Sequence, residues 1–477
     1  MFAILKRHKR FFLAFTLLGF ALRWIYTHQF HMVAGDGLIY GDIALNLLKH
    51  GVYGLSGETG PVPTLIRLPG YPLFLAAVFS VFGAENYRAA MYVQMFIDIG
   101  TCFVVADLAR RVAGERASRI AFVIAALCPL TINFVSVALT ETLALFFTAV
   151  AFDLAVAGFQ RMDSADAGLA PLSDHWLWIG CGLATGACIL VRPDSGLILI
   201  TLGPVIAWRL LRGGHRRHTF VAGVLIAAFA FAPLVPWAVR NWRVFHVFQP
   251  LAPYSATDPD EPVLKGFGRW TATWVADYSS LEDLVFNVPG ETADFRTLPN
   301  RAFDTPEERA RTQRLFEEYA DAGNSLTSEM DADFGKLADE RTARHPLRTH
   351  VWLPVMRMLD MWFRPRTEFL PLDIHWWNYR DDINEFLITI SLGVLNLLIV
   401  AAAIAGLLKK PRMRFVGPLV LYIVLRTVFF TWAGTVEPRY MMECFPLLFV
   451  FAARFVASFG ERAFAANRTG AAGAAPA

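Results

Sequence analysis

Residues 140–159 read TETLALFFTAVAFDLAVAGF, an almost wholly apolar stretch with two acids and no basic residue. A helix needs about 20 mostly apolar residues to cross a bilayer, so this stretch predicts a membrane span. Further runs of this kind lie on both sides of it, at 11–27, 88–109, 118–135, 176–191, 194–211, 219–238, 385–408, 415–433 and 441–459. The sequence therefore predicts an all-α polytopic membrane protein with about ten transmembrane helices.

One more apolar stretch, 69–83, is shorter and begins with Pro69-Gly-Tyr-Pro72, which fits an interfacial or re-entrant helix better than a span. Composition agrees with a membrane protein: of 477 residues, 55% are hydrophobic and 18% are charged. Soluble domains carry about 25% charged residues. This shortage of charge excludes a disordered chain, a nucleic-acid binder and an ordinary cytosolic enzyme.

Basic residues in the short loops predict the orientation of the spans. With the N-terminus inside, the inner segments hold twenty Lys and Arg, among them Lys6, Arg110, Arg212, Lys409 and the tail residues Arg454, Arg462 and Arg468. The short outer segments hold five: Lys49, Arg67, Arg88, Arg192 and Arg439. We therefore expect a multi-pass protein of the cytoplasmic (inner) membrane with both termini in the cytoplasm.

The spans predict three parts of the chain. Residues 1–239 form an N-terminal transmembrane module with seven spans and a first exported loop, 28–87. Residues 240–384 form an exported subdomain that is acidic, with 17 Lys and Arg against 24 Asp and Glu. Residues 385–477 hold three spans and a cytoplasmic tail.

Within the exported subdomain, local patterns predict three helices. Thr305-Pro306-Glu307-Glu308 is a capping box that begins one of them, and a second covers 328–343. The third, 347–363, is amphipathic and is expected to lie on the membrane surface or to cap a cavity mouth.

Two residue types inside the spans have simple structural interpretations. All five cysteines lie in predicted spans (Cys102, Cys128, Cys181, Cys188 and Cys444), which argues against a disulfide framework and for buried thiols. Gly182 and Gly186 have the spacing of a close helix–helix contact.

Charged residues collect at the outer ends of the spans. Few lie near span centres, namely Arg23, Asp98, Asp153 and Arg426, which disfavours an ion-driven transporter. The outer layer instead holds Asp36, Asp42, Arg67, Glu141, Arg192, Arg240, Glu437 and Arg439. Arginine presents a planar, permanently charged fork to phosphate oxygens, and a carboxylate accepts a proton. These residue types at the lipid surface suit a reaction between a lipid phosphate and a hydroxyl acceptor.

The same positions carry a family resemblance. The motifs, in chain order, are Asp36-Gly-Leu-Ile-Tyr40-Gly-Asp42-Ile-Ala44-Leu-Asn46-Leu47, Arg67-Leu-Pro69-Gly-Tyr71-Pro72, Leu139-Thr-Glu141-Thr, Leu190-Val-Arg192-Pro193, Pro236-Trp-Ala-Val-Arg240-Asn241 and Pro438-Arg439-Tyr440. Together they resemble the GT-C glycosyltransferases, in the bacterial branch related to protein O-mannosyltransferases and aminoarabinose transferases. The resemblance covers spans one to seven and span ten, and hardly touches 245–384.

This resemblance implies an inverting enzyme that moves a hexosyl or pentosyl unit from a polyprenyl-phosphate donor to a hydroxyl acceptor at the outer face of the membrane. The acceptor is a glycolipid, a polysaccharide or a protein, and no nucleic-acid partner is implied. Asp36 matches the catalytic base, although many relatives place a second acid where this chain has Gly37. Glu141 either orients the substrates or ligates a divalent cation, which is the one cofactor to consider. Substrate binding is expected from Tyr40, Asp42, Arg67, Arg192, Arg240, Arg439 and Tyr440.

Each residue also has a plain structural interpretation. Asp36 and Glu141 suit helix N-caps, Asp42 suits an exposed or arginine-paired carboxylate, and Tyr40 suits packing. The outer arginines suit interfacial positions, and Glu437 suits a partner for one of them. The alternative function is a transporter or flippase of lipid-linked sugars, which would bind the same phosphate without breaking a bond.

Overall fold

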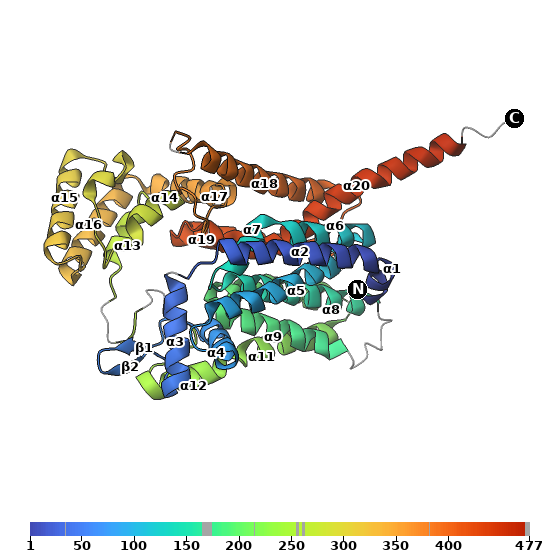
Figure 1. Cartoon of the computed structure of the whole chain (residues 1–477), viewed down its shortest axis with the longest axis horizontal. Coiled ribbons are helices and arrows are strands. Elements are labelled where there is room, and N and C mark those ends of the chain that lie inside the picture. Colours follow the sequence, from blue (N-terminus) through green and yellow to red (C-terminus); the bar gives the residue numbers. More distant parts are fainter. Residues whose placement is uncertain are drawn as a thin grey trace.

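The computed structural model describes the whole chain except residues 34, 165–173, 214, 254–256, 260–262, 381 and 473–477, and for 460–472 it describes the backbone alone. Long helices run side by side along the longest axis of the molecule (Figure 1). A subdomain of short helices lies at one end of this bundle, and the chain begins at the other end.

Each predicted span is helical in the structure. The corresponding elements are α2 (Lys9–Gln29), α5 (Tyr87–Ala113), α6 (Glu115–Leu127) with α7 (Pro129–Ile132), α8 (Glu141–Ser164), α9 (His175–Val191), α10 (Leu197–Arg212), α11 (Arg216–Phe231) with α12 (Leu234–Phe245), α18 (Ile383–Leu408), α19 (Val416–Ala433) and α20 (Phe445–Ala472). Seven segments are long and apolar enough to span a membrane alone, and two bent pairs bring the number to nine among the described residues. The tenth predicted span is α9, an apolar helix of 17 residues.

The bend between α6 and α7, of 50°, has a local cause. Pro129 has no N–H group to donate to the carbonyl of Ala125, so the helix breaks there. Arg23 of α2 reaches the freed carbonyls, with 2.8 Å from its Nη1 to Ala126 O, while its Nε lies 2.8 Å from Oδ2 of Asp98. The intramembrane pair Arg23–Asp98 therefore joins three helices.

Close helix contacts occur where the sequence has glycine. A Cβ atom on Gly182 would lie 2.7 Å from Ile226 O, and one on Gly186 would lie 2.5 Å from Ala230 O. The predicted close contact is confirmed, between α9 and α11. The five cysteines are free and buried, also as predicted.

The loop predicted to be exported, 28–87, contains α3 (Asp36–His50), a hairpin of β1 (Gly54–Gly57) and β2 (Gly60–Pro63), and α4 (Gly70–Phe82). Two glycines bring it against the bundle. A Cβ atom on Gly37 would lie 2.8 Å from Ala138 O, and one on Gly70 would lie 2.5 Å from Leu190 O. The start of α3 thus touches the turn before α8, and the start of α4 touches the end of α9.

The exported subdomain contains α13 (Gly266–Thr271), α14 (Tyr278–Ser280), α15 (Pro306–Asp321) and α16 (Ser328–Arg344). Thr305 caps α15 by accepting a hydrogen bond from Glu308 N at 3.2 Å, so the predicted helix start is confirmed. The core of this part is aromatic, with Trp270 packed against Phe316 and Phe334. These aromatic residues belong to the same hydrophobic cluster as the core of the bundle.

The predicted helix 347–363 appears as η7 (Arg348–Trp352) and α17 (Leu353–Phe363). It is amphipathic: Leu353, Arg357 and Trp362 are buried, whereas Val355 and Leu359 are exposed. The segment after it packs against the transmembrane helices. Asn133, which directly follows α7, donates a 2.6 Å hydrogen bond to Glu368 O in this segment. Part of the predicted exported region therefore packs among the spans.

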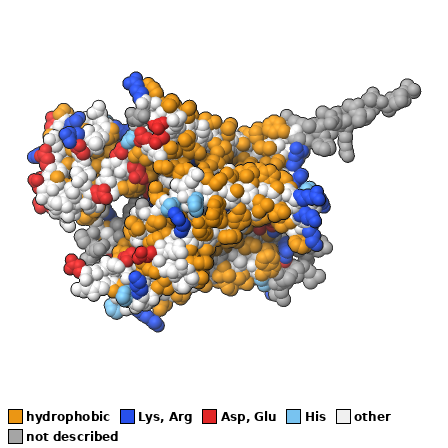
Figure 2. All heavy atoms as spheres, viewed as in Figure 1, with side chains coloured by type: hydrophobic (Ala, Val, Ile, Leu, Met, Phe, Trp, Pro, Cys, Tyr) orange, Lys and Arg blue, Asp and Glu red, His pale blue; other side chains and the backbone are white. Residues whose placement is uncertain are grey.

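Charged side chains are unevenly distributed along the long axis on the face that Figure 2 shows. Lys and Arg side chains gather at the end of the bundle where the chain begins, and Asp and Glu side chains gather toward the subdomain (Figure 2). Hydrophobic side chains cover the flank between these ends. Arg462 and Arg468, two of the predicted inner cations, lie outside the described side chains.

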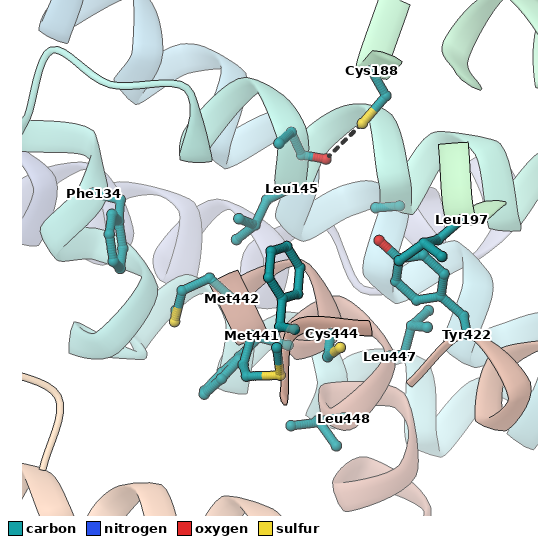
Figure 3. Packing of buried hydrophobic residues seen from close by; sticks show 14 of the residues in the cluster. Phe134, Leu145, Cys188, Leu197, Tyr422, Met441, Met442, Cys444, Leu447 and Leu448 are labelled. Carbon is teal, nitrogen blue, oxygen red and sulfur yellow. Dashed lines mark hydrogen bonds between the residues drawn. The ribbon is translucent and has the colours of Figure 1, made fainter. Parts of the chain in front are cut away.

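Helix η8 (Pro438–Cys444) forms the centre of the packed core. Its Met441, Met442 and Cys444 are fully buried, and Figure 3 shows them among Leu145 of α8, Leu197 of α10 and Tyr422 of α19. The rigid packing of η8 fixes the two residues at its start, Arg439 and Tyr440.

Candidate active site

Asp36 is the first residue of α3, and its side chain pairs with an arginine instead of capping the helix. The N-cap position is Gly35, and no side chain caps this helix. Oδ1 of Asp36 instead lies 2.7 Å from Nη2 of Arg67, which comes from the segment before α4. The N-cap interpretation of Asp36 is therefore wrong, and its carboxylate faces the arginine layer.

Glu141 begins α8 and is almost completely buried. Its Oε1 lies 2.9 Å from Nη1 of Arg192, the residue that follows α9. Its Oε2 has no hydrogen-bond partner among the described residues. A buried carboxylate is costly without a counter-charge, so Arg192 and Glu141 stabilise each other.

Arg439 of η8 joins the two carboxylates. Its Nη2 lies 3.6 Å from Oδ2 of Asp36, and its Nη1 lies 3.8 Å from Oε1 of Glu141. Its Nε pairs with Glu437. Residues far apart in the sequence thus form one layer of alternating charges, as the sequence predicts.

Two tyrosines pack beside this layer. The ring of Tyr440 lies under the guanidinium groups of Arg192, at 4.7 Å, and Arg439, at 5.3 Å. Such cation–π contacts fix the planes of both arginines. Tyr40 lies one turn after Asp36 and packs edge-on against Tyr71, with ring centroids 5.2 Å apart.

A cavity of about 1310 Å³ opens over this layer. Its polar end is lined by Asp36, Tyr40, Arg67, Arg192, Arg439 and Tyr440. The remaining wall is mostly apolar and comes from α10, α11, α12 and α19, with Ile200, Phe231, Val235, Val239, Phe429 and Phe430. Several of these side chains, Ile200 and Phe231 among them, are exposed, so the apolar wall continues to the flank of the bundle.

Three residues predicted for the site do not line this cavity. Glu141 pairs with the lining residue Arg192, whereas the other two, Asp42 and Arg240, lie elsewhere. Asp42 accepts hydrogen bonds from Ser56, at 2.7 Å from the backbone N, and so holds α3 to the hairpin. Arg240 donates to the backbone carbonyls of Thr64 at 2.7 Å and Tyr53 at 2.6 Å. Both residues therefore shape the exported loop that carries Arg67.

The sequence reasoning did not single out two acids that pair with Arg192, namely Asp194, which lines the cavity, and the buried Glu443. Asp194 lies 3.4 Å from Nε of Arg192 and 2.7 Å from Nη2 of Arg426. Glu443 lies 3.1 Å from Nε of Arg192 and also pairs with Arg426. The signal that could have identified them is Arg426 itself, since an arginine deep in a span requires an acid partner.

Asp36 and Tyr40, both in α3, have shifted pKa values. Burial acts to raise the pKa of Asp36, but the positive charges of Arg67 and Arg439 outweigh it and hold this pKa below its ordinary value. Burial and the neighbouring Asp36 raise the pKa of Tyr40. At neutral pH, Asp36 is an ionised acceptor and Tyr40 is a neutral phenol.

The residues present do not fit a resident divalent cation. Among the described residues, no group of three or more His, Cys, Asp or Glu side chains has a metal-binding arrangement. Gly37 stands where a second acid would be, and the gap to Ala138 leaves no room for one. The guanidinium groups of Arg67, Arg192 and Arg439 occupy the positions around Asp36 and Glu141 that a cation would take.

Comparison with known proteins adds to this geometry. No family model and no curated protein matches the sequence. Among solved structures, the oligosaccharyltransferase AglB from Archaeoglobus fulgidus, in complex with an inhibitory peptide and a dolichol-phosphate, matches 99% of this chain and 53% of its own, with 13% identity and a TM-score of 0.54. Its apo form matches 98% of this chain and 52% of its own, with 14% identity and a TM-score of 0.52.

The chain thus spans about half the length of AglB. ArnT from Cupriavidus metallidurans, in the apo state, matches 92% of this chain and 77% of its own at 14% identity, but its TM-score of 0.37 carries no argument. At these identities the likeness shows the fold alone. The chain therefore shares its fold with the matched half of AglB.

Proposed function

We propose that the protein is a glycosyltransferase that uses a polyprenyl-phosphate-linked sugar and acts at the outer face of the cytoplasmic membrane. The observation that carries this proposal is the composition of the cavity: Asp36, Arg67 and Arg439 line one end, and most of the remaining lining is apolar. A lipid-linked sugar phosphate has the same division, with an apolar tail joined to a charged headgroup. Support comes from the shared fold with AglB, a protein solved with a dolichol-phosphate.

The donor phosphate binds between Arg67 and Arg439. Both line the cavity, and both are partly accessible, with side-chain exposures of 23% and 14%. Arg192 is less accessible and has three carboxylate partners, Glu141, Asp194 and Glu443. We therefore assign phosphate binding to Arg67 and Arg439, and to Arg192 the role of holding Glu141 in place.

Binding of the donor weakens the ion pairs of Asp36 with Arg67 and Arg439, so that Asp36 can act as the base. Asp36 pairs with the same two arginines that would hold the phosphate. A phosphate oxygen that takes over these contacts weakens the hold on the carboxylate and places a negative charge near it. Both effects raise the proton affinity of Asp36 when the acceptor needs a base.

The reaction is a single displacement. The acceptor hydroxyl oxygen attacks the anomeric carbon while the bond from that carbon to the phosphate oxygen breaks. Asp36 takes the hydroxyl proton, the glycosidic bond forms, and polyprenyl phosphate leaves with its charge held by Arg67 and Arg439. The anomeric configuration inverts. A positioned base is worth roughly 10²–10⁴ in rate, and the donors around the leaving phosphate contribute a comparable factor.

The apolar wall gives the tail a path. Residues from α10, α11, α12 and α19 form this wall, and several are exposed on the flank of the bundle. The prenyl chain lies along it and leaves the headgroup at the polar end. The acceptor, a glycolipid, polysaccharide or protein that receives a hexosyl or pentosyl unit, approaches from the side of the exported subdomain.

The proposal is tested with purified protein in nanodiscs and a radiolabelled polyprenyl-phosphate sugar. An acceptor extract from cell envelopes should cause release of polyprenyl phosphate and transfer of label, and NMR of the product should show an inverted anomeric centre. A flippase would move intact donor across proteoliposome membranes without releasing polyprenyl phosphate. Donor that stays intact with every acceptor fraction would refute the glycosyltransferase.

A further inference from the structure

The segment formed by η7 and α17 has an apolar face that no described part of the chain covers. Its members recur at helical spacing and are between 39% and 76% exposed: Leu347, Val351, Trp352, Val355, Leu359 and Phe363. The opposite face is buried and includes Leu353 and Met361. A contiguous apolar face of this kind marks an interaction surface.

Hydrogen bonds fix the depth of this segment relative to the spans. Trp362 donates from Nε1 to Oγ1 of Thr427, at 3.0 Å, and accepts at its backbone O from Asn396, at 2.7 Å. Thr427 lies six residues before the end of α19, about 9 Å along that helix from Ala433. Asn396 lies near the middle of the 26-residue span α18. The end of α17 is therefore level with the interior of two spans.

The other end of the segment is level with the outer end of α19. The ring of His350 lies 6.4 Å from the ring of Trp432, which is one residue before the end of that helix. Between His350 and Trp362, the segment thus follows α19 inward. The exposed face of α19 carries Val424, Val428 and Trp432. The apolar face of α17 therefore lies beside the exposed apolar face of α19, which a membrane-spanning helix presents to lipid.

We infer that η7 and α17 form a half-membrane helix whose apolar face contacts the acyl chains of the outer leaflet. The inference does not depend on the proposed enzyme activity. Lipid fits better than another protein, because the surface continues the lipid-facing stripe of α19 and because Trp352 and Trp432 suit the interfacial level. The chain just after the segment reaches the residue before Arg439, because Arg366 donates a 2.5 Å hydrogen bond to Pro438 O.

Cysteine labelling tests the inference, since the five native cysteines are free and buried and leave little background. Val355→Cys, Leu359→Cys and Phe363→Cys probe the apolar face, and Glu318→Cys on the exposed surface of α15 is the matched control. In proteoliposomes, a membrane-impermeant charged maleimide should label the control at least tenfold faster than Leu359→Cys and Phe363→Cys. Equal rates would overturn the inference.

A second readout separates lipid from a protein cover. A bimane fluorophore on each probe position, in the same proteoliposomes, should be quenched by brominated acyl chains, whereas bimane at position 318 should not. Slow labelling without quenching would mean that a second copy or another protein covers the face, and this outcome also overturns the inference. Retention of the wild-type elution volume in each variant confirms folding.

Discussion

Asp36 and Arg67 face each other at the polar end of the cavity, with 2.7 Å between Oδ1 of the carboxylate and Nη2 of the guanidinium. Arg439 approaches the other oxygen of Asp36, at 3.6 Å. The proposed base is therefore held by the cations that would bind the donor phosphate. The carboxylate and the phosphate compete for the same partners, and this competition yields distinct predictions for donor binding and for transfer.

Asp36→Asn should lower the transfer rate by roughly 10²–10⁴, because the amide cannot take the acceptor proton. Donor affinity should stay the same or increase, since the competing negative charge is gone. Isothermal titration with polyprenyl phosphate and a transfer assay give the two quantities separately. Full activity in this variant would exclude Asp36 as the base, and a large loss of donor affinity would contradict the competition.

Arg439→Ala should weaken donor binding by at least tenfold, because it removes one of the two cations proposed to hold the donor phosphate. The same guanidinium lies close to both Asp36 and Glu141. Arg439→Lys should recover part of the affinity, since it restores the charge without the planar fork. Arg88→Ala is the matched control: Arg88 is also an outer-side arginine, but it faces His31 and does not line the cavity. Equal losses in Arg439→Ala and Arg88→Ala would show a general charge effect.

The pH dependence of kcat/KM should show the effect of the arginines around Asp36 on its pKa. Its pKa lies below the ordinary 3.8, so the base is ionised through the neutral range and the acid limb of kcat/KM falls below that value. The ion pair likewise stabilises the fold above the unfolded pKa of about 3.9, and this contribution is lost as the pH falls through the lower folded pKa. Arg67→Gln should move the acid limb to higher pH. An unchanged limb in that variant would exclude control by Arg67.

Arg23→Ala should destabilise the fold by about 3–5 kcal/mol, because it leaves Asp98 charged and unpaired among buried groups. Arg23→Met combined with Asp98→Leu should recover much of the loss, since no charge is then buried. Thermal unfolding in detergent measures both effects. Activity per folded molecule should be unchanged in the double variant; loss of activity there at full stability would point to a functional role for the pair.

Chelation of divalent cations should leave transfer unchanged, because guanidinium groups already neutralise Asp36 and Glu141. The assay compares enzyme dialysed against EDTA with enzyme supplied with Mg²⁺ or Mn²⁺. A loss with EDTA that added metal restores would contradict this prediction and return Glu141 to the role of a metal ligand.

Hydropathy and charge predicted most of the fold, because a bilayer permits few arrangements of long apolar runs. Each predicted span is helical, and the motifs around Asp36, Arg67, Glu141, Arg192 and Arg439 converge on one layer. What the sequence could not provide is lateral packing. The partners of Asp42 and Arg240 depend on how the exported loop folds, and the depth of α17 depends on contacts with α18 and α19.

The two acids that pair with Arg426 were missed for the same reason. Asp194 and Glu443 look like ordinary residues at a span end until Arg426 is placed between them. A local motif cannot reveal the pairing of Asp194 with Arg426, which lie more than 200 positions apart. The sequence predicted where charge would lie along the membrane normal, and the structure added which charges meet.

The contact between Gly37 and Ala138 affects which parts of the site can change during evolution. The hydrogen atom at position 37 lets α3 rest on the backbone before α8, so the separation of Asp36 and Glu141 is set by main chain against main chain. Side chains around the cavity are then free to vary and to admit new sugars or acceptors. A single added methyl group at position 37 would disturb this backbone contact, and with it the separation of Asp36 and Glu141.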